Sequence, residues 1–273
     1  MRRIQLTILS LSFCLLTGAP SYASDKVSLK DKLLGVFRRS FQISTAQEEA
    51  LSTEMDKSVR KQFPVSNDSR ATAFVKTMMD KLSANAKSPF PISITVLEDA
   101  KTVNAFAIPG GRIYVTRGML NLVDNDAQLA GVLGHELAHV TLRHVSQRVS
   151  DQTTAALAVR LMQKLTDKNI EQSRVTNALK YVMFQKFSRD AEYQADEAGL
   201  KFMVDAGYDP EGMVQVKDKL LTLSKGSRGL EFLSSHPDTA KRKAEVQALI
   251  KEKGYKSNGQ VLLTSDFKAS LQK

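Results

Sequence analysis

The stretch from His135 to His144 reads His-Glu-Leu-Ala-His-Val-Thr-Leu-Arg-His. Apolar side chains recur around it every three or four residues, which predicts a half-buried helix, and the polar residues at 124–126 can cap its start. Residues four apart lie on one face of a helix, so His135 and His139 can bind one metal ion with Glu136 beside a bound water. The stretch therefore predicts a zinc site, in preference to two buried structural histidines.

A third protein ligand is needed, and His144 is the nearest candidate. If the helix continues at about 100° per residue, His144 points roughly 140° away from His139 and roughly 180° away from His135. We therefore expect His144 to be a polar residue on the helix face.

The acidic segment Ser188–Gly199 is a better source of the third ligand. It is predicted to be helical, and Gly199 is suited to a C-cap. Glu192 and Asp196 lie four residues apart. One carboxylate could bind zinc while the other accepts the free N–H of a ligating histidine.

Two further stretches, Asn104–Gly111 and Ser235-His236-Pro237 with Arg242 behind it, complete a set of four motifs. In this order they resemble the HtpX/CAAX-endopeptidase-like family of zinc peptidases, in the gluzincin clan. The resemblance implies three zinc ligands, a catalytic base and two supporting residues. These are His135, His139 and Glu192 as ligands, Glu136 as base, and Asp196 and Arg242 as support. It also implies a soluble, periplasmic branch of the family.

The role of His236 has two readings. In the simpler reading, His236 is a polar cap on the helix that can begin at Pro237. The resemblance implies instead that His236 reaches the active site. There it could donate to the developing oxyanion, or occupy the open zinc position and keep the enzyme latent.

The region before the zinc helix is rich in β-prone residues. Runs at 92–97, 103–108 and 112–116 predict a small sheet, with Pro109-Gly110-Gly111 as a turn. Peptidases of this architecture commonly hold substrate as an added strand. We therefore expect the ribbon that starts at Asn104, Ala105, Phe106 and Ala107 to bind the substrate main chain, although a core hairpin is an equally good reading.

The predicted fold class is α+β, a mainly helical zincin-like domain with a small β-sheet preceding the active-site helix. Further helices are expected at 44–62 and 68–82. Helices at 154–165 and 175–187 are expected to flank a polar turn, and this excursion could cover the cleft as a lid. The expected division is a signal peptide at 1–23, an N-terminal helical arm at 24–62, a zinc metallopeptidase domain at 63–250 and a C-terminal tail at 251–273.

The N-terminus reads as a secretory signal. Arg2 and Arg3 precede an apolar stretch that is too short to span a bilayer comfortably, and Ser21-Tyr22-Ala23 is a small-residue cleavage site. The single cysteine, Cys14, would leave with this signal, which excludes disulfides and a thiol nucleophile. We therefore expect a soluble protein in the periplasm of a Gram-negative bacterium, without a transmembrane segment in the mature chain.

The chain is basic. Its formal charge of +10 falls to +8 when the signal is removed, because Arg2 and Arg3 leave with no acidic residue. Such a surface can associate with an anionic envelope surface or can merely keep the protein soluble. An amphipathic basic helix expected at 28–41 has the same two readings. No recognisable module supports binding to nucleic acid.

Two functions fit these residues. The first is a zinc-dependent endopeptidase that hydrolyses misfolded or stalled envelope proteins as part of periplasmic quality control, with Glu136 as the base. The second is a chaperone or assembly factor for outer-membrane proteins with latent proteolytic activity. The intact Glu136 favours the first.

Overall fold

A small sheet and a long buried helix form the centre of the protein. The structure is a computed structural model, and it describes residues 44–150, 186–226, 231–256 and 269. All of these belong to one unit, Arg38–Lys273. Its elements in chain order are α2 (Thr45–Gln62), α3 (Ser69–Ser83), β1 (Ser93–Leu97), β2 (Ala105–Ile108), β3 (Arg112–Thr116), α4 (Arg117–Leu122), α5 (Asp126–Thr141), α6 (His144–Ser150), α9 (Arg189–Asp205), α10 (Glu211–Gly226), α11 (Glu231–Ser235) and α12 (Thr239–Lys253).

The sheet has the strand order β1-β3-β2. β1 runs parallel to β3, and β2 pairs with β3 as an antiparallel hairpin, with Ala105 opposite Val115. Gly110 and Gly111 form the hairpin turn at φ values of 79° and 84°, which glycine adopts without steric cost. The predicted fold class, mainly helical with a small sheet before the zinc helix, is confirmed.

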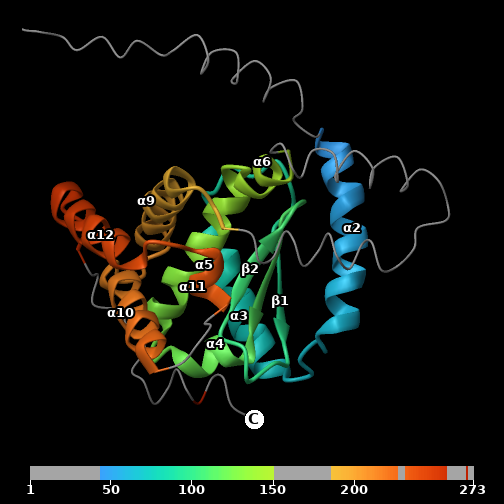
Figure 1. The fold of residues 1–273 in the computed structure, drawn as a ribbon, viewed down its shortest axis with the longest axis horizontal. Helices are drawn as coiled ribbons and strands as arrows, with labels where there is room; N and C mark the ends of the chain where they lie inside the picture. Colours follow the sequence, from blue (N-terminus) through green and yellow to red (C-terminus); the bar gives the residue numbers. More distant parts are fainter. Residues whose placement is uncertain (1–43, 151–185, 227–230, 257–268, 270–273) are drawn as a thin grey trace, which may run out of the picture. The chain divides into compact units, whose positions relative to one another are not determined.

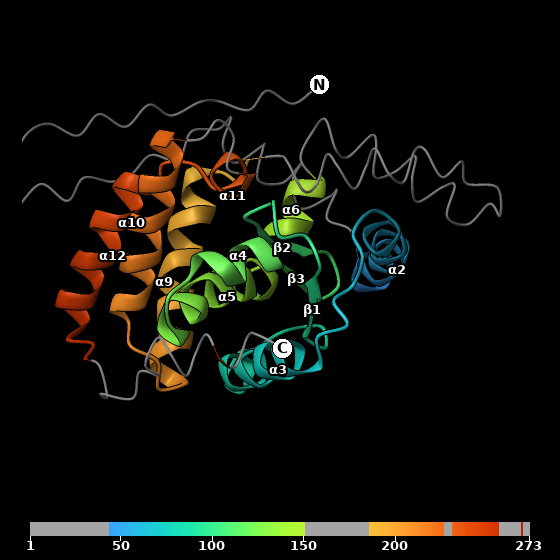
Figure 2. The same ribbon diagram turned by 90° about the horizontal axis from the view of Figure 1, so that it is seen from below.

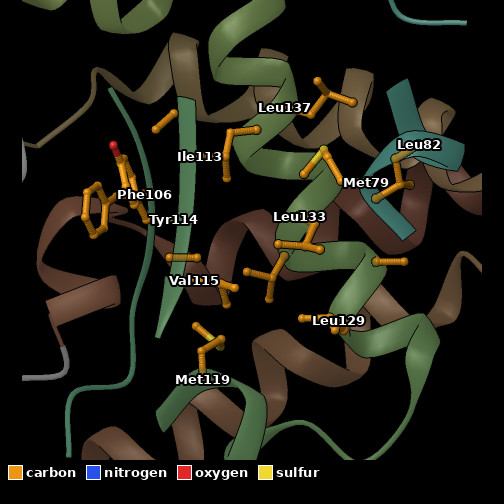
Figure 3. Packing of buried hydrophobic residues seen from close by; sticks show 14 of the residues in the cluster. Met79, Leu82, Phe106, Ile113, Tyr114, Val115, Met119, Leu129, Leu133 and Leu137 are labelled. Carbon is orange, nitrogen blue, oxygen red and sulfur yellow. The ribbon is translucent and has the colours of Figure 1, made fainter. Parts of the chain in front are cut away.

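Side chains on both faces of the sheet are buried. Figure 3 shows Ile113 and Val115 of β3 pointing toward the apolar side chains of α5. Tyr114 points the other way, stacks on Phe106 and donates from Oη to Asp56 of α2 over 2.6 Å. The sheet therefore lies between α2 and α5, as both views of the ribbon show (Figures 1 and 2).

Helix α5 packs closely against α9 and α10 (Figure 1). At the crossing with α9, a Cβ atom added to Gly199 would lie 2.9 Å from the backbone carbon of Gly134. Only glycine allows the two backbones to approach this closely. The predicted C-cap at Gly199 is therefore wrong: α9 continues to Asp205, and Gly199 lies inside the helix because it faces α5.

Several predicted features lie outside the described residues. They are the signal peptide at 1–23, the basic helix at 28–41, most of the excursion at 154–187 and the tail beyond residue 256, apart from residue 269. Within the part that is described, no helix has both the length and the apolar character needed to cross a membrane.

Candidate metal centre

Helix α5 carries three of the predicted site residues. Asn125 caps its start by accepting the backbone N–H of Gln128 over 2.8 Å. His135 and His139 lie one turn apart, and their Nε2 atoms are 3.1 Å from each other. Glu136 follows His135, and each of these three side chains is 2% exposed or less.

Helix α9 brings two carboxylates to the same place. Ser188 caps it by accepting the backbone N–H of Ala191, and Glu192 and Asp196 are both buried one turn apart. Oε1 of Glu192 lies 3.4 Å from Nε2 of His139. The close crossing of α5 and α9 therefore joins the histidine pair to a carboxylate that lies more than fifty residues later in the chain.

A fourth side chain joins this group. His236 lies between α11 and α12, with Nδ1 3.1 Å from Nε2 of His135 and 3.0 Å from Oε1 of Glu192. The potential ligand atoms of His135, His139, Glu192 and His236 all lie within 4.8 Å of one another. His236 is 1% exposed and makes no side-chain cap on α12, which argues against the plain reading as a helix cap.

The donor set fits zinc. A tetrahedral zinc ion with bonds of about 2.1 Å holds its ligand atoms about 3.4 Å apart, and the separations among Nε2 of His135 and His139, Nδ1 of His236 and Oε1 of Glu192 include values from 3.0 to 3.4 Å. Nδ1 of His135 lies 2.9 Å from Oδ1 of Asp196, which places the ring proton on Nδ1 and leaves the lone pair on Nε2. Lone pairs therefore converge from several sides, and a cation at their centre would stabilise them.

Glu136 lies beside this group without being part of it. Among the described residues neither of its carboxylate oxygens has a hydrogen-bond partner. Nε2 of His236 is 3.4 Å from Oε1, and the backbone N–H of Ala107 faces the carboxylate but falls outside hydrogen-bond geometry. Burial raises the pKa of Glu136 to about 7.

A network of charges supports His135. Oδ1 of Asp196 also accepts from Nζ of Lys217 over 2.8 Å and from Nη2 of Arg242 over 2.7 Å, while Nη1 of Arg242 donates to Glu192. Burial acts to raise the pKa of Asp196, but the charges of Lys217 and Arg242 hold it well below its usual range. Burial also lowers the pKa of His135 to about 4, so the ring is neutral and able to bind a metal.

Lys217 was missed by the sequence reasoning. It lies on α10 and is 6% exposed, and its burial lowers the pKa to about 8. Within α10 it stands among other lysines in a helix with mixed charges, and nothing in the sequence marks it as the buried one.

A different set of side chains supports His139, and here one prediction is wrong. His144 is not a polar residue on the face of α5: it is 3% exposed, with Nδ1 3.0 Å from Nδ1 of His139. The physical reason is that α5 ends at Thr141 and Arg143 takes a left-handed conformation at φ 57°, so the assumed continuation of the helix does not exist. Phe187 stacks on a face of the His139 ring, with centroids 3.8 Å apart.

The predicted substrate ribbon lies next to the site. Asn104, Ala105, Phe106 and Ala107 are all buried, and the strand that contains the last three packs against α5. Oδ1 of Asn104 is buried without a hydrogen-bond partner among the described residues. Burial agrees with a core hairpin, while the unpaired oxygen and the position of Ala107 beside Glu136 agree with a binding role.

Several known proteins resemble this chain, among them two OMA1 metalloendopeptidases and a beta-barrel assembly-enhancing protease. The mitochondrial metalloendopeptidase OMA1 of Arabidopsis thaliana is 36% identical over 151 residues, which are 55% of this chain and 30% of that protein. The beta-barrel assembly-enhancing protease of Escherichia coli K12 is 27% identical over 241 residues, 84% of this chain and 48% of that protein. The mitochondrial metalloendopeptidase OMA1 of Schizosaccharomyces pombe is 29% identical over 184 residues, 66% of this chain and 53% of that protein. This chain thus spans about half the length of these relatives or less.

A family comparison covers most of the chain and includes every residue of the metal centre. The model of peptidase family M48 matches residues 69–250. That stretch begins at α3 and ends in α12, so it contains the sheet, the crossing of α5 and α9, and His236. The zinc-peptidase resemblance drawn from four short motifs is confirmed at this level, and the chain belongs to peptidase family M48.

Proposed function

We propose that this protein is a zinc-dependent endopeptidase. The observation that carries the proposal is Glu136, a buried carboxylate without a hydrogen-bond partner among the described residues. A buried carboxylate that accepts no hydrogen bond is costly to keep, and a purely structural metal site has no use for it. Its position beside the ligand group of His135, His139 and Glu192 suits a residue that transfers a proton during hydrolysis.

Each residue would have a separate task. His135, His139 and Glu192 would hold the metal, with Asp196 and Arg242 fixing His135 and Glu192 from behind. Zinc, when bound, would supply Lewis-acid chemistry that acidifies a water molecule and polarises the scissile carbonyl group. Glu136 would accept the proton of the attacking water and later deliver it to the leaving amine.

His236 would control or assist this reaction. Its Nδ1 lies among the ligand atoms, which supports a role as a fourth donor that keeps the enzyme latent. Its Nε2 lies 3.4 Å from Glu136, which supports the alternative of helping to stabilise the oxyanion. Replacing His236 with Ala separates the two roles, because turnover rises if His236 caps the metal and falls if it stabilises the oxyanion.

The substrate would be a protein segment in extended conformation. β2 lies at the end of the strand order, so an added strand beside Asn104–Ala107 would run past Glu136. The unpaired Oδ1 of Asn104 is then available to accept a main-chain N–H of the substrate. Because these residues are buried, the strand edge would have to open before a substrate binds.

We further propose misfolded or stalled proteins of the bacterial envelope as the substrates, with the periplasm as the location. The signal-like segment at 1–23 supports export, and the name of one relative, beta-barrel assembly-enhancing protease, supports a role in the envelope. We also propose the domain division expected from the sequence, and the family match at 69–250 supports a catalytic domain at 63–250 within it. The basic charge leaves association with an anionic envelope surface as part of the same proposal.

A comparison of wild type and Glu136→Gln tests the activity. Metal analysis should give about one zinc per chain in both proteins, while cleavage of an unfolded protein such as casein should fall by at least about 100-fold in the variant. Glu197→Gln is the matched control, because Glu197 is an exposed acid on α9, and it should cleave like wild type.

The outcomes separate the candidate functions. Equal cleavage by wild type and Glu136→Gln would contradict the mechanism. Binding of the unfolded substrate without cleavage by either protein would favour the chaperone function. Absence of zinc from the wild type would contradict the metal site itself.

A further inference from the structure

We propose that His144 is a positioning residue, which holds His139 in the orientation and tautomer needed to bind the metal. The inference rests on the proposed zinc site and concerns a residue outside the ligand group. It depends on the contacts of His144 on both sides of its ring.

The backbone turn between α5 and α6 brings His144 close to His139. After α5 ends, Arg143 adopts its left-handed conformation, which is uncommon for a residue with a side chain. This turn starts α6 and folds His144 back under α5, so that Nδ1 of His144 lies 3.0 Å from Nδ1 of His139. A helix that simply continued would have carried His144 to the opposite side.

Contacts from another element hold this turn. Glu48 of α2 is 3% exposed and accepts from Nη2 of Arg143 over 2.7 Å and from the hydroxyl of Ser146. It also accepts the backbone N–H of Gly110 in the turn between β2 and β3, over 3.4 Å. A strained turn persists only where its surroundings hold it in place, and here α2 and the hairpin do so.

The direction of the hydrogen bonds follows from the partners. Nε2 of His144 lies 3.1 Å from Oε1 of Gln194, and an amide oxygen can only accept. The ring proton of His144 is therefore on Nε2, and its Nδ1 carries a lone pair. Nδ1 of His139 must donate to that lone pair, which leaves Nε2 of His139 as the atom that faces Glu192 and the metal.

This arrangement does for His139 what Asp196 does for His135. An outer partner fixes the tautomer and the ring direction of a metal ligand, and its loss typically weakens metal binding about 10–100-fold. The usual partner is a carboxylate or a backbone carbonyl, whereas His144 is a neutral ring and brings no charge to this side of the site.

Three substitutions of His144 in the full chain test the proposal. Asparagine branches at the same carbon as the imidazole ring, so its Oδ1 can take the place of Nδ1 and accept from His139. Glutamine places its polar atoms further out, toward Gln194, and alanine removes both contacts. We expect the zinc dissociation constant, measured by competition with a chromophoric chelator, to rise about 10–100-fold in His144→Ala and His144→Gln and to stay within about threefold of wild type in His144→Asn.

The cobalt-substituted proteins give a second measurement. The visible absorption bands of Co²⁺ report the geometry of its ligands, so His144→Ala should change them and His144→Asn should keep the wild-type spectrum. Gln147→Ala is the matched control, because Gln147 is exposed on the same short helix, and it should behave like wild type in both measurements.

Wild-type zinc affinity and a wild-type cobalt spectrum in His144→Ala would overturn the proposal while leaving the metal site intact. A wild type that binds no zinc would instead contradict the proposed function. If His144→Ala fails to fold, the Asn and Gln variants decide: recovery by Asn alone supports the proposal, and equal affinities in the two variants overturn it.

Discussion

The two histidines of α5 face the same group of ligand atoms, yet they are supported by opposite kinds of chemistry. Nδ1 of His135 meets a carboxylate, Asp196, that is itself held by the cations of Lys217 and Arg242. Nδ1 of His139 meets His144, a neutral ring, and its face is covered by Phe187. One half of the site is ionic. We call the other half neutral, because the two rings that contact His139 carry no charge, although the guanidinium of Arg148 lies 3.8 Å from the centroid of the Phe187 ring.

This difference predicts how much stability a substitution in each half should cost. In the ionic half every charge depends on a partner, so removing one member leaves another charge buried and unpaired, at a cost of about 3–5 kcal/mol. In the neutral half the loss of one hydrogen bond or one ring contact costs about 0.5–1.5 kcal/mol. The two halves should therefore differ in stability effects even where both orient a metal ligand.

Asp196→Asn should have the largest effect. The amide cannot neutralise Lys217 and Arg242, so the free energy of unfolding of the metal-free protein should fall by about 3–5 kcal/mol. Urea unfolding with EDTA present measures this. The control is Asp218→Asn, which breaks an exposed pair with Lys243 and should cost less than about 1 kcal/mol. A loss in Asp196→Asn no larger than in the control would show that the buried network is not stabilising.

Lys217→Met should have an intermediate effect. It removes one cation from Asp196 but leaves the two hydrogen bonds from Arg242, so the free energy of unfolding should fall by about 2 kcal/mol. Zinc affinity should change by less than in Asp196→Asn, because the carboxylate still accepts from His135. Chelator competition on both variants measures this difference, and equal losses of affinity would assign the orientation of His135 to Lys217 as well.

The difference in stability between wild type and Lys217→Met should also depend on pH, and the pKa of Lys217 gives its sign. Burial lowers the pKa of Lys217 from 10.5 to about 8, so between these values the unfolded chain binds more protons than the native state. The contribution of this lysine to the free energy of unfolding therefore rises as the pH increases from 8 to 10.5. The stability of wild type relative to Lys217→Met should increase over that range, and unfolding curves at pH 7.5 and pH 10 would show it.

The ionic half was largely predictable from the sequence, and the neutral half was not. The spacing of four residues on a helix places Glu192 and Asp196 on one face, and that geometry is local. The assignment of one as ligand and the other as support needed the family resemblance. Lys217 could not be predicted, because a lysine on a helix of mixed charge carries no sign of burial until α10 is packed against α5 and α12.

The prediction that His144 lies on the polar face of a continuing helix is wrong for one reason. The angle of 100° per residue holds only while the helix continues, and the sequence between Thr141 and His144 contains no glycine or proline to mark its end. Arg143 takes the left-handed turn instead, with Glu48 of α2 holding its side chain. A tertiary contact across almost a hundred residues thus ends the helix. Gly199 shows the reverse error, since a residue typical of a helix end serves there as a point of close packing.

Phe187→Leu should have the smallest effect and gives the sharpest test of the neutral half. Leucine keeps an apolar side chain beside His139 but loses the ring stacking, so the free energy of unfolding should fall by about 1 kcal/mol. The substitution also removes the contact between the Arg148 guanidinium and the Phe187 ring, 3.8 Å from its centroid, but it removes no charged group, so this loss should change less with salt than the loss in Asp196→Asn. Urea unfolding of the metal-free variant at two salt concentrations, compared with Asp196→Asn, measures both values. If Phe187→Leu weakened zinc binding as strongly as Asp196→Asn, ring packing rather than the direction of hydrogen bonds would orient the ligands, and the contrast between the halves would not hold.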